Sequence, residues 1–385
     1  MDLANKKKIL QIIPKLDIGG AEEGTIETSI YMTKRRWKVF VVSKGGSLVN
    51  RLVLNNVTHI NMSVESKNPI IMIFNIFRLM FLIKKYKIKI VHVRSRAPAW
   101  SAFYACKFSR GVKFITTVHG AYQNQNEIKR FYNSIMIEGN KVIAISKYIK
   151  KYLIKNFKLS KRKKKNIVTI PRGVSNSKFN LKKISTKRMI SLSQKWEAPD
   201  GIPIILFPSR IASFKGHKTL LKALSILKKD PNNKFTCIML GATKNNSDIA
   251  LDLTAYIKKE ELSDNVKFPG KCNDMPAAYK LSDIVVSPAD KPEGFGRIIL
   301  EAQAMKRPVI ASAHGGSLEL IKDNYNGFLF TPKDEYELAN KIKHAISLSK
   351  KKKLKLIKNA KINKENFNIE KMCESNYKLY NSLIN

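Results

Sequence analysis

Two glutamates that flank a glycine pair are the side chains of this sequence best suited to chemistry. Glu293 is followed directly by Gly294, Phe295 and Gly296, and Glu301 comes next, with seven residues between the two carboxylates. An apolar run precedes the group, which predicts a loop at the carboxyl end of a strand and then a helix. Carboxylates accept hydrogen bonds from sugar hydroxyls, and a helix start offers free N–H groups to a phosphate. The simplest ligand that suits both the carboxylates and the helix start is a sugar joined to a phosphate.

Two cations follow another predicted strand, at 204–208. Arg210 and Lys215 stand five positions apart in the loop after it, and Gly216 permits a tight turn into the next helix. Arginine can chelate phosphate oxygens and lysine acts as a point charge, so the pair suits a diphosphate. A solvated loop in a lysine-rich protein is the alternative for these two residues alone. The two glutamates in the same half of the chain favour phosphate binding.

The first half contributes two weaker signals. Gly19 and Gly20 follow the first predicted strand, where a glycine pair lets backbone approach a ligand at a helix start. The spacing is not G-x-G-x-x-G, so a dinucleotide fingerprint is not supported. His119 stands beside Gly120 at a predicted strand end and is the best placed of the six histidines, with a structural histidine as the alternative. His314 also follows a predicted strand, in a loop with a glycine pair.

The elements that must position these residues are short apolar runs alternating with helical patterns. Continuous apolar runs separated by helices predict buried parallel strands joined by right-handed crossovers. The predicted strands are 9–13, 37–43, 88–93, 113–118, 142–145 and 167–170, then 204–208, 235–240, 266–268, 283–287, 308–312 and 327–330. The fold class is therefore α/β, with two doubly wound, Rossmann-like domains facing each other across a cleft.

The domain boundary is predicted from a change of composition. Residues 176–201 hold Lys, Ser and Asn with few apolar runs, which is typical of a linker. We therefore expect a first domain at 1–185 and a second at 186–365. The segment 366–385 has a helical pattern and is expected to pack back against the first domain.

Composition places the chain in a reducing compartment. It has 385 residues and 44% hydrophobic content, which is typical of a globular protein. Its four cysteines are scattered and none forms a pair with metal spacing, so neither a disulfide framework nor a metal site is expected. The apolar run at 9–13 is too short for a signal peptide. These features favour the cytoplasm.

The net charge of +43 bears on partners rather than on fold. Mutational drift in an AT-rich genome is one explanation for so many lysines, and attraction to an anionic membrane surface is the other. Nucleic acid is disfavoured because no module of interleaved basic and aromatic residues is present. The apolar segment 69–83 is too short to span a bilayer. It is interpreted as a core helix or as a helix docked into the membrane surface.

Together these motifs resemble those of the retaining glycosyltransferases of the GT-B architecture that carry two glutamates seven residues apart, family four in the usual classification. The resemblance covers essentially the whole chain. It rests on Gly19-Gly20-Ala21-Glu22, Thr117-Val118-His119-Gly120, Ser209-Arg210 with Lys215-Gly216, Glu293 to Glu301, Val309-Ile310-Ala311-Ser312 and Gly315-Gly316. Val93 to Ser101 and His119 to Tyr122 further resemble alphaproteobacterial members associated with lipopolysaccharide core assembly.

The resemblance implies a role for each matching residue. Arg210 and Lys215 would hold the donor diphosphate, Glu293 would accept hydroxyls of the transferred sugar, and Glu301 would bind the ribose. The amides of Gly294, Phe295 and Gly296 would help to position sugar and phosphate, His119 would reach the sugar from the first domain, and Gly19 and Gly20 would border acceptor and phosphate. Arg172 departs from the family, where many members have Asn before Gly.

The resemblance also implies a UDP- or GDP-sugar donor with no metal and no other cofactor. The acceptor would be a membrane-associated glycolipid or glycan, in lipopolysaccharide core or surface polysaccharide synthesis, at the inner face of the cytoplasmic membrane. With Glu301 on the ribose, no second carboxylate remains as a nucleophile, so we expect front-face transfer with retention. A sugar-nucleotide epimerase of the same architecture and a basic nucleic-acid-binding protein are the alternatives.

Overall fold

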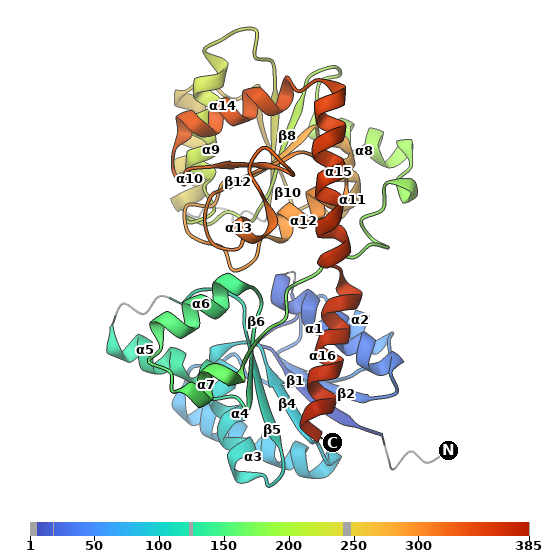
Figure 1. Ribbon diagram of the computed structural model, residues 1–385, viewed down its shortest axis with the longest axis vertical. Helices are drawn as coiled ribbons and strands as arrows, with labels where there is room; N and C mark the ends of the chain where they lie inside the picture. Colours follow the sequence, from blue (N-terminus) through green and yellow to red (C-terminus); the bar gives the residue numbers. More distant parts are fainter. Residues whose placement is uncertain (1–5, 18, 123–125, 242–247, 385) are drawn as a thin grey trace. The chain divides into compact units, whose positions relative to one another are not determined.

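The computed structural model describes residues 6–17, 19–122, 126–241 and 248–384. The chain forms two compact units (Figure 1). Unit 1 comprises Met1–Arg172 together with Ile369–Asn385, and unit 2 comprises Gly173–Asn368. Each unit is a parallel sheet with helices packed on it, so the predicted fold class of two Rossmann-like domains is confirmed.

Unit 1 is built on a seven-stranded sheet of order β3-β2-β1-β4-β5-β6-β7. Ile9 of β1 pairs with Val39 on one side and with Ile90 on the other, both in parallel. Its strands are β1 (Lys8–Ile12), β2 (Lys38–Ser43), β3 (Thr58–Asn61), β4 (Ile90–Val93), β5 (Lys113–Val118), β6 (Lys141–Ala144) and β7 (Ile167–Thr169). The central strands are buried on both faces, which explains their continuous apolar runs.

Unit 2 is built on a six-stranded parallel sheet of order β10-β9-β8-β11-β12-β13. Its strands are β8 (Ile204–Pro208), β9 (Thr236–Leu240), β10 (Val266–Gly270), β11 (Ile284–Ser287), β12 (Val309–Ser312) and β13 (Phe328–Phe330). Ile205 of β8 pairs with Cys237 on one side and with Ile284 on the other. The chain order reverses between β8 and β11, which makes their carboxyl ends the topological switch point, where open α/β sheets bind ligands.

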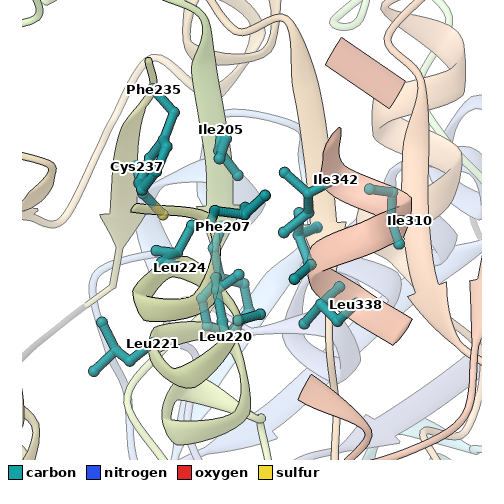
Figure 2. Packing of buried hydrophobic residues seen from close by; sticks show 14 of the residues in the cluster. Ile205, Phe207, Leu220, Leu221, Leu224, Phe235, Cys237, Ile310, Leu338 and Ile342 are labelled. Carbon is teal, nitrogen blue, oxygen red and sulfur yellow. The ribbon is translucent and has the colours of Figure 1, made fainter. Parts of the chain in front are cut away.

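The core of unit 2 lies between the sheet and the helices packed on it, among them α9 (His217–Lys228) and α14 (Glu335–Ile346) (Figure 2). Phe207 of β8 and Ile310 of β12 pack against Leu220 of α9 and against Leu338 and Ile342 of α14. The last four of these five side chains are fully buried, and Phe207 is 1% exposed. This packing fixes the strands whose ends carry the candidate site.

Helices cover both sheets, and several begin at a side-chain cap. The helices of unit 1 are α1 (Gly20–Lys34), α2 (Val49–Val53), α3 (Pro69–Tyr86), α4 (Arg96–Phe108), α5 (Glu127–Ser134), α6 (Lys147–Asn156), α7 (Lys161–Asn166) and α16 (Ile369–Ile384). Those of unit 2 are α8 (Thr186–Trp196), α9 (His217–Lys228), α10 (Asp248–Lys259), α11 (Met275–Leu281), α12 (Arg297–Ala304), α13 (Ser317–Leu320), α14 (Glu335–Ile346) and α15 (Lys350–Asn366). Asn68 and Ser146 accept from backbone N–H groups at the starts of α3 and α6.

The helix α16 is an integral part of unit 1. Tyr380 is fully buried, and its hydroxyl lies 2.6 Å from Nδ1 of His92 on β4. The other ring nitrogen of His92 lies 2.6 Å from the hydroxyl of Thr117 on β5. The ring of Trp37 packs against Tyr380 at 6.1 Å. Residues near the end of the sequence therefore complete the core of the first sheet.

Three features differ from the sequence-based expectations. The units divide between Arg172 and Gly173 rather than at 185, because the backbone N–H of Val174 already donates to Phe367 O, 2.9 Å away. The stretch 176–201 is not a bare linker: it contains α8, which packs on α11. The strand β3 was not predicted, because Thr58–Asn61 is short and only half-buried.

Candidate functional site

The loops after β8 and β11 meet at the switch point of unit 2. Lys215, in the first loop, lies with its Nζ atom 2.6 Å from Oε1 of Glu293, in the second. Both side chains are about four-fifths buried, with 19% and 21% exposed. The structure therefore brings together two of the predicted site residues that are 78 positions apart in the chain.

A glycine makes this approach possible. Gly216 has φ +80°, in the left-handed region, and a Cβ atom built on it would lie 1.7 Å from the carbonyl oxygen of Pro288. No side chain fits there, because both the conformation and the contact exclude a Cβ atom. Arg210 lies in the same loop as Lys215 and is exposed. Within the described residues, no ion pair joins Arg210 to either predicted glutamate.

The glycine pair leads directly into α12, as predicted. Gly296 has φ +103° and is the N-cap of α12, so the free N–H groups of that helix start lie next to Glu293 in the chain. Phe295 is 3% exposed and its ring packs against Phe367, with centroids 5.7 Å apart. Its side chain thus anchors the loop while the backbone of Gly294 stays accessible. This arrangement can accept an anion at the helix start.

Glu301 lies one turn into α12 and is held by two donors. The Tyr279 hydroxyl donates to Oε2 at 2.9 Å, and the Arg297 guanidinium donates to Oε1 at 2.9 Å. Burial, and then the charge of Glu301, raises the pKa of Tyr279 well above its ordinary value, so that Tyr279 remains a donor. Neither partner was predicted from the sequence, where only the (i, i+4) spacing of Arg297 and Glu301 indicates one of them.

A small pocket, partly open to solvent, lies beside Glu293. It is lined by Ser287, Ala289, Glu293, Gly296, Ile299, Ser312, His314 and Ser317. The loop after β12 is fixed against the glutamate loop, because the N–H of Gly316 donates to Glu293 O at 2.9 Å. A Cβ atom at Gly316 would lie 2.4 Å from the Cα of Phe295, so glycine is required for this packing. Ser312 and His314 therefore belong to the same site as Glu293.

His217 stays uncharged next to these cations. It is 3% exposed, and its ring packs against Phe207 at 4.6 Å. Burial, reinforced by the positive charge of Lys215, lowers the pKa of His217 to about 4. At neutral pH His217 therefore adds no positive charge beside Lys215.

The predicted residues of the first half lie at the carboxyl ends of strands in unit 1. Gly19 is the N-cap of α1 and Gly20 its first residue. His119 follows β5, and its Nε2 atom is buried with no hydrogen-bond partner among the described residues. Burial, and then the charges of Arg172 and Arg94, lower the pKa of His119 well below its ordinary value, so it is neutral. It stays a prediction that Gly19, Gly20 and His119 complete a donor site with unit 2.

The departure at Arg172 has a structural explanation. Arg172 is 5% exposed and donates to the carbonyl oxygen of Gly20 at 2.6 Å, so it holds the start of α1. A Cβ atom at Gly24 would lie 1.6 Å from the guanidinium, so the absence of a side chain there makes room for it. Glu27 lies 3.7 Å from Arg172 and offsets its charge. Arg172 therefore positions α1.

Among the described residues, no group of three or more His, Cys, Asp or Glu side chains could hold a metal ion. No helix in the described part of the chain has the length and apolar character that crossing a bilayer requires.

Comparison with known proteins identifies similar chains. The family model described as Glycosyltransferase Family 4 matches residues 18–178, and the model described as Glycosyl transferases group 1 matches residues 188–363. The crystal structure of a glycosyltransferase from Rickettsia africae is 36% identical, with a TM-score of 0.88 and 99% of each chain covered. An uncharacterized glycosyltransferase from Methanocaldococcus jannaschii is 27% identical over 82% of this chain and 81% of its own length.

Two structures with lower identity share the fold. Anabaena HepE in complex with UDP and glucose is 21% identical, with a TM-score of 0.84 and coverage of 98% of this chain and 100% of its own. WaaG, a glycosyltransferase involved in lipopolysaccharide biosynthesis, is 15% identical, with a TM-score of 0.75 and coverage of 96% and 99%.

Proposed function

Because this chain belongs to the glycosyltransferases of the GT-B fold, we propose that it moves a hexose-type sugar from a UDP- or GDP-sugar to a membrane-associated glycolipid or glycan, with retention of configuration. The observation that carries the donor half of the proposal is the Lys215–Glu293 pair at the switch point of unit 2, next to the start of α12. A cation, a carboxylate and free backbone N–H groups are together suited to a sugar phosphate.

Each residue then acts on a different part of the donor. Arg210 and Lys215 bind the diphosphate and offset the charge that grows on the leaving group. Glu293 accepts hydrogen bonds from hydroxyls of the sugar, and Glu301 accepts them from the ribose. His119 approaches the sugar as a neutral ring, and Gly19 and Gly20 border the phosphate and the acceptor.

We propose front-face transfer because both carboxylates at the site are assigned to binding the donor. Glu293, beside Lys215, accepts from the sugar hydroxyls, and Glu301, held by Tyr279 and Arg297, accepts from the ribose, so no further carboxylate is left as a nucleophile. The bond from the acceptor oxygen to the anomeric carbon forms as the bond to the phosphate oxygen breaks. The acceptor proton passes to that departing phosphate oxygen. The protein positions the reactants and stabilises charge, with no metal required.

The acceptor half of the proposal rests on α3. Its inner side is buried through Asn75, Leu79, Leu82 and Ile83. Its outer side carries Ile70, Phe74, Phe77 and Phe81, which are 64%, 65%, 64% and 62% exposed. Core packing therefore accounts for only one side of this helix. The spacing of four, three and four places the exposed side chains in one stripe.

Lysines follow the exposed stripe of α3 in the chain, and they indicate which kind of surface binds it. Lys84 and Lys85 lie in the last turn of α3, and the Lys85 ammonium lies over the Phe81 ring at 5.6 Å. A helix with aromatic residues beside lysines is typical of one that lies in the interface of an anionic bilayer. The net charge of +43 opposes association with a second copy of the chain. We therefore assign a peripheral position at the inner face of the cytoplasmic membrane, with a lipopolysaccharide core or surface polysaccharide precursor as acceptor.

The donor assignment is tested by binding and then by transfer. UDP-glucose, UDP-galactose, UDP-N-acetylglucosamine and GDP-mannose are screened for the rise in melting temperature that a bound ligand causes. With the best donor, Lys215→Ala and Glu293→Ala should each lower transfer at least about a hundredfold, because each removes charge stabilisation at the reacting centre.

The matched control is Lys222→Ala. Lys222 forms an ion pair with Glu335 at 2.9 Å elsewhere in unit 2, and its loss should leave transfer unchanged. Near-normal transfer in both Lys215→Ala and Glu293→Ala would show that these residues do not form the donor site. If the wild-type chain binds none of the four donors, the proposal that it uses a UDP- or GDP-sugar is wrong.

A further inference from the structure

The carboxylate of Glu301 is held by two donors of opposite character. The Tyr279 hydroxyl, which donates to Oε2, belongs to a side chain that is fully buried. The Arg297 guanidinium, which donates to Oε1, belongs to a side chain that is 30% exposed. The Glu301 side chain itself is 12% exposed. One carboxylate oxygen is therefore fixed from the interior, while the other is covered by a group that solvent can reach.

The helix that carries Tyr279 is fixed at its start. The Asp274 side chain caps α11 by accepting from the N–H of Ala277 at 3.2 Å, and it also forms an ion pair with Arg188 of α8 at 2.5 Å. Further along α11, the Tyr279 ring packs edge-to-face on Phe179, with centroids 5.9 Å apart. The place of the Tyr279 hydroxyl is therefore set by the protein itself.

A glutamate carboxylate without such a partner turns easily. The terminal torsion of Glu has broad minima rather than staggered ones, so its two oxygens are poorly positioned on their own. A hydrogen bond from a buried hydroxyl fixes this torsion, and fixing a group before the ligand arrives lowers the cost of binding. A buried tyrosine needs some acceptor, and a backbone oxygen would satisfy that need. Here the acceptor is instead a carboxylate at the candidate donor site.

The two hydroxyls of a ribose are ligand groups that suit this carboxylate. An ionised carboxylate only accepts hydrogen bonds, and its two oxygens offer about four lone-pair sites. The bonds from Tyr279 and Arg297 use two of these sites. Two neighbouring hydroxyls can donate to the sites that remain. A phosphate brings no donor and is repelled by the carboxylate.

We infer that Tyr279 is a positioning residue for the donor nucleotide, because it fixes the Glu301 carboxylate from inside unit 2 and so makes binding depend on the ribose hydroxyls. This inference rests on the proposed function, in which Glu301 binds the ribose. Tyr279 acts through Glu301 and not on the donor itself. Removing its hydroxyl should therefore lower the preference for ribose and leave the affinity for a nucleotide without ribose hydroxyls unchanged.

The test uses UDP and 2′,3′-dideoxy-UDP, which lacks both ribose hydroxyls. Each is titrated into the protein in a calorimeter, and the corresponding guanine nucleotides are used instead if the chain prefers GDP. The wild type should bind UDP at least about tenfold more tightly, because the dideoxy ligand loses hydrogen bonds to a charged acceptor. Tyr279→Phe should weaken binding of UDP about tenfold and binding of 2′,3′-dideoxy-UDP less than about twofold.

Three comparisons separate positioning from general damage to the fold. Both ligands are measured on the same variant, so a loss of stability would weaken both alike. Glu301→Gln should already reduce the preference for UDP, and adding Tyr279→Phe to it should change that preference less than about twofold, because the two residues act as one unit. Tyr336→Phe, at a tyrosine of α14 that is 68% exposed, should bind both ligands as the wild type does.

The possible outcomes separate the inference from the proposed function. Equal weakening of UDP and 2′,3′-dideoxy-UDP in Tyr279→Phe would overturn the inference, because Tyr279 would then support only the fold. Unchanged binding of UDP in that variant would overturn it as well. If the wild type binds the two ligands equally, Glu301 does not bind the ribose, and the inference is wrong with that assignment. A wild-type chain that binds neither UDP nor GDP, nor their sugars, would overturn the proposed function itself.

Discussion

At the scale of single residues, the candidate site depends on places where a side chain cannot be accommodated. Gly216 combines a left-handed backbone with the close approach of Pro288, and this allows the Lys215 loop to reach the Glu293 loop. In the turn that carries His314, Gly315 is also left-handed and close to Glu293, and Gly316 leaves room for the backbone of Phe295. The charged residues are thus brought together by neighbours that have no functional groups of their own.

Replacing Gly216 tests this dependence. Gly216→Ala should lower the free energy of unfolding of unit 2 by about 3 kcal/mol or more, since it adds left-handed strain to a backbone collision. Gly201→Ala is the matched control. Gly201 has φ +74° but no atom within 4 Å of its Cβ position, so only the strain of about 1–2 kcal/mol should appear. Urea unfolding followed by circular dichroism measures both, and equal losses would show that the close approach is unimportant.

The residues of this site were easier to predict from the sequence than the side chains that contact them. The proximity of Lys215 and Glu293 was predictable because both follow parallel strands, whose carboxyl ends share one edge of a sheet. Tyr279 and Ser312 were not placed in the site, because their roles arise from contacts between segments far apart in the chain. Arg172 appeared only as a departure from a family pattern, and its explanation required the space left by Gly24.

At the scale of elements, long buried strands were predictable and half-polar ones were not. The apolar runs of β8 and β11 are visible in the sequence because these strands are buried on both faces. The strand β3 and the helix α8 were missed because their sequences are mostly polar: β3 has no fully buried residue, and α8 buries only Trp196. For α3 the sequence left core packing and membrane docking open, because an apolar segment does not reveal how many of its sides are covered.

The outer stripe of α3 can be removed without touching the sheet. The triple variant Phe74→Ser, Phe77→Ser and Phe81→Ser should lower binding to phosphatidylglycerol-containing vesicles at least about tenfold, because it removes apolar area that enters the interface. Flotation with vesicles of phosphatidylcholine, with and without phosphatidylglycerol, measures the loss. Leu251→Ser with Leu354→Ser is the control, since these residues are 58% and 57% exposed in unit 2. If all three proteins float equally, α3 is not the docking element.

At the scale of the whole molecule, the charge of +43 acts against the folded state. Like charges repel more in a compact chain than in an unfolded one, and salt screens this repulsion within a Debye length that falls from about 10 Å at 0.1 M to about 3 Å at 1 M. The melting temperature should therefore rise with added sodium chloride, by about 2–4 °C for each kcal/mol of repulsion that is screened. Differential scanning calorimetry in sodium and potassium chloride checks this. A melting temperature that falls with either salt would mean that attractive ion pairs outweigh the repulsion.

The placement of α16 also determines when each unit can be finished during protein synthesis. Tyr380, Met372 and Cys373 belong to the core of the first sheet, yet the ribosome adds them after every residue of unit 2. Unit 2 can therefore reach its final fold while unit 1, although made earlier, still exposes the apolar surface that awaits α16. We expect a released chain truncated after Asn368 to have a protease-resistant second half and an unprotected first half, as measured by limited proteolysis.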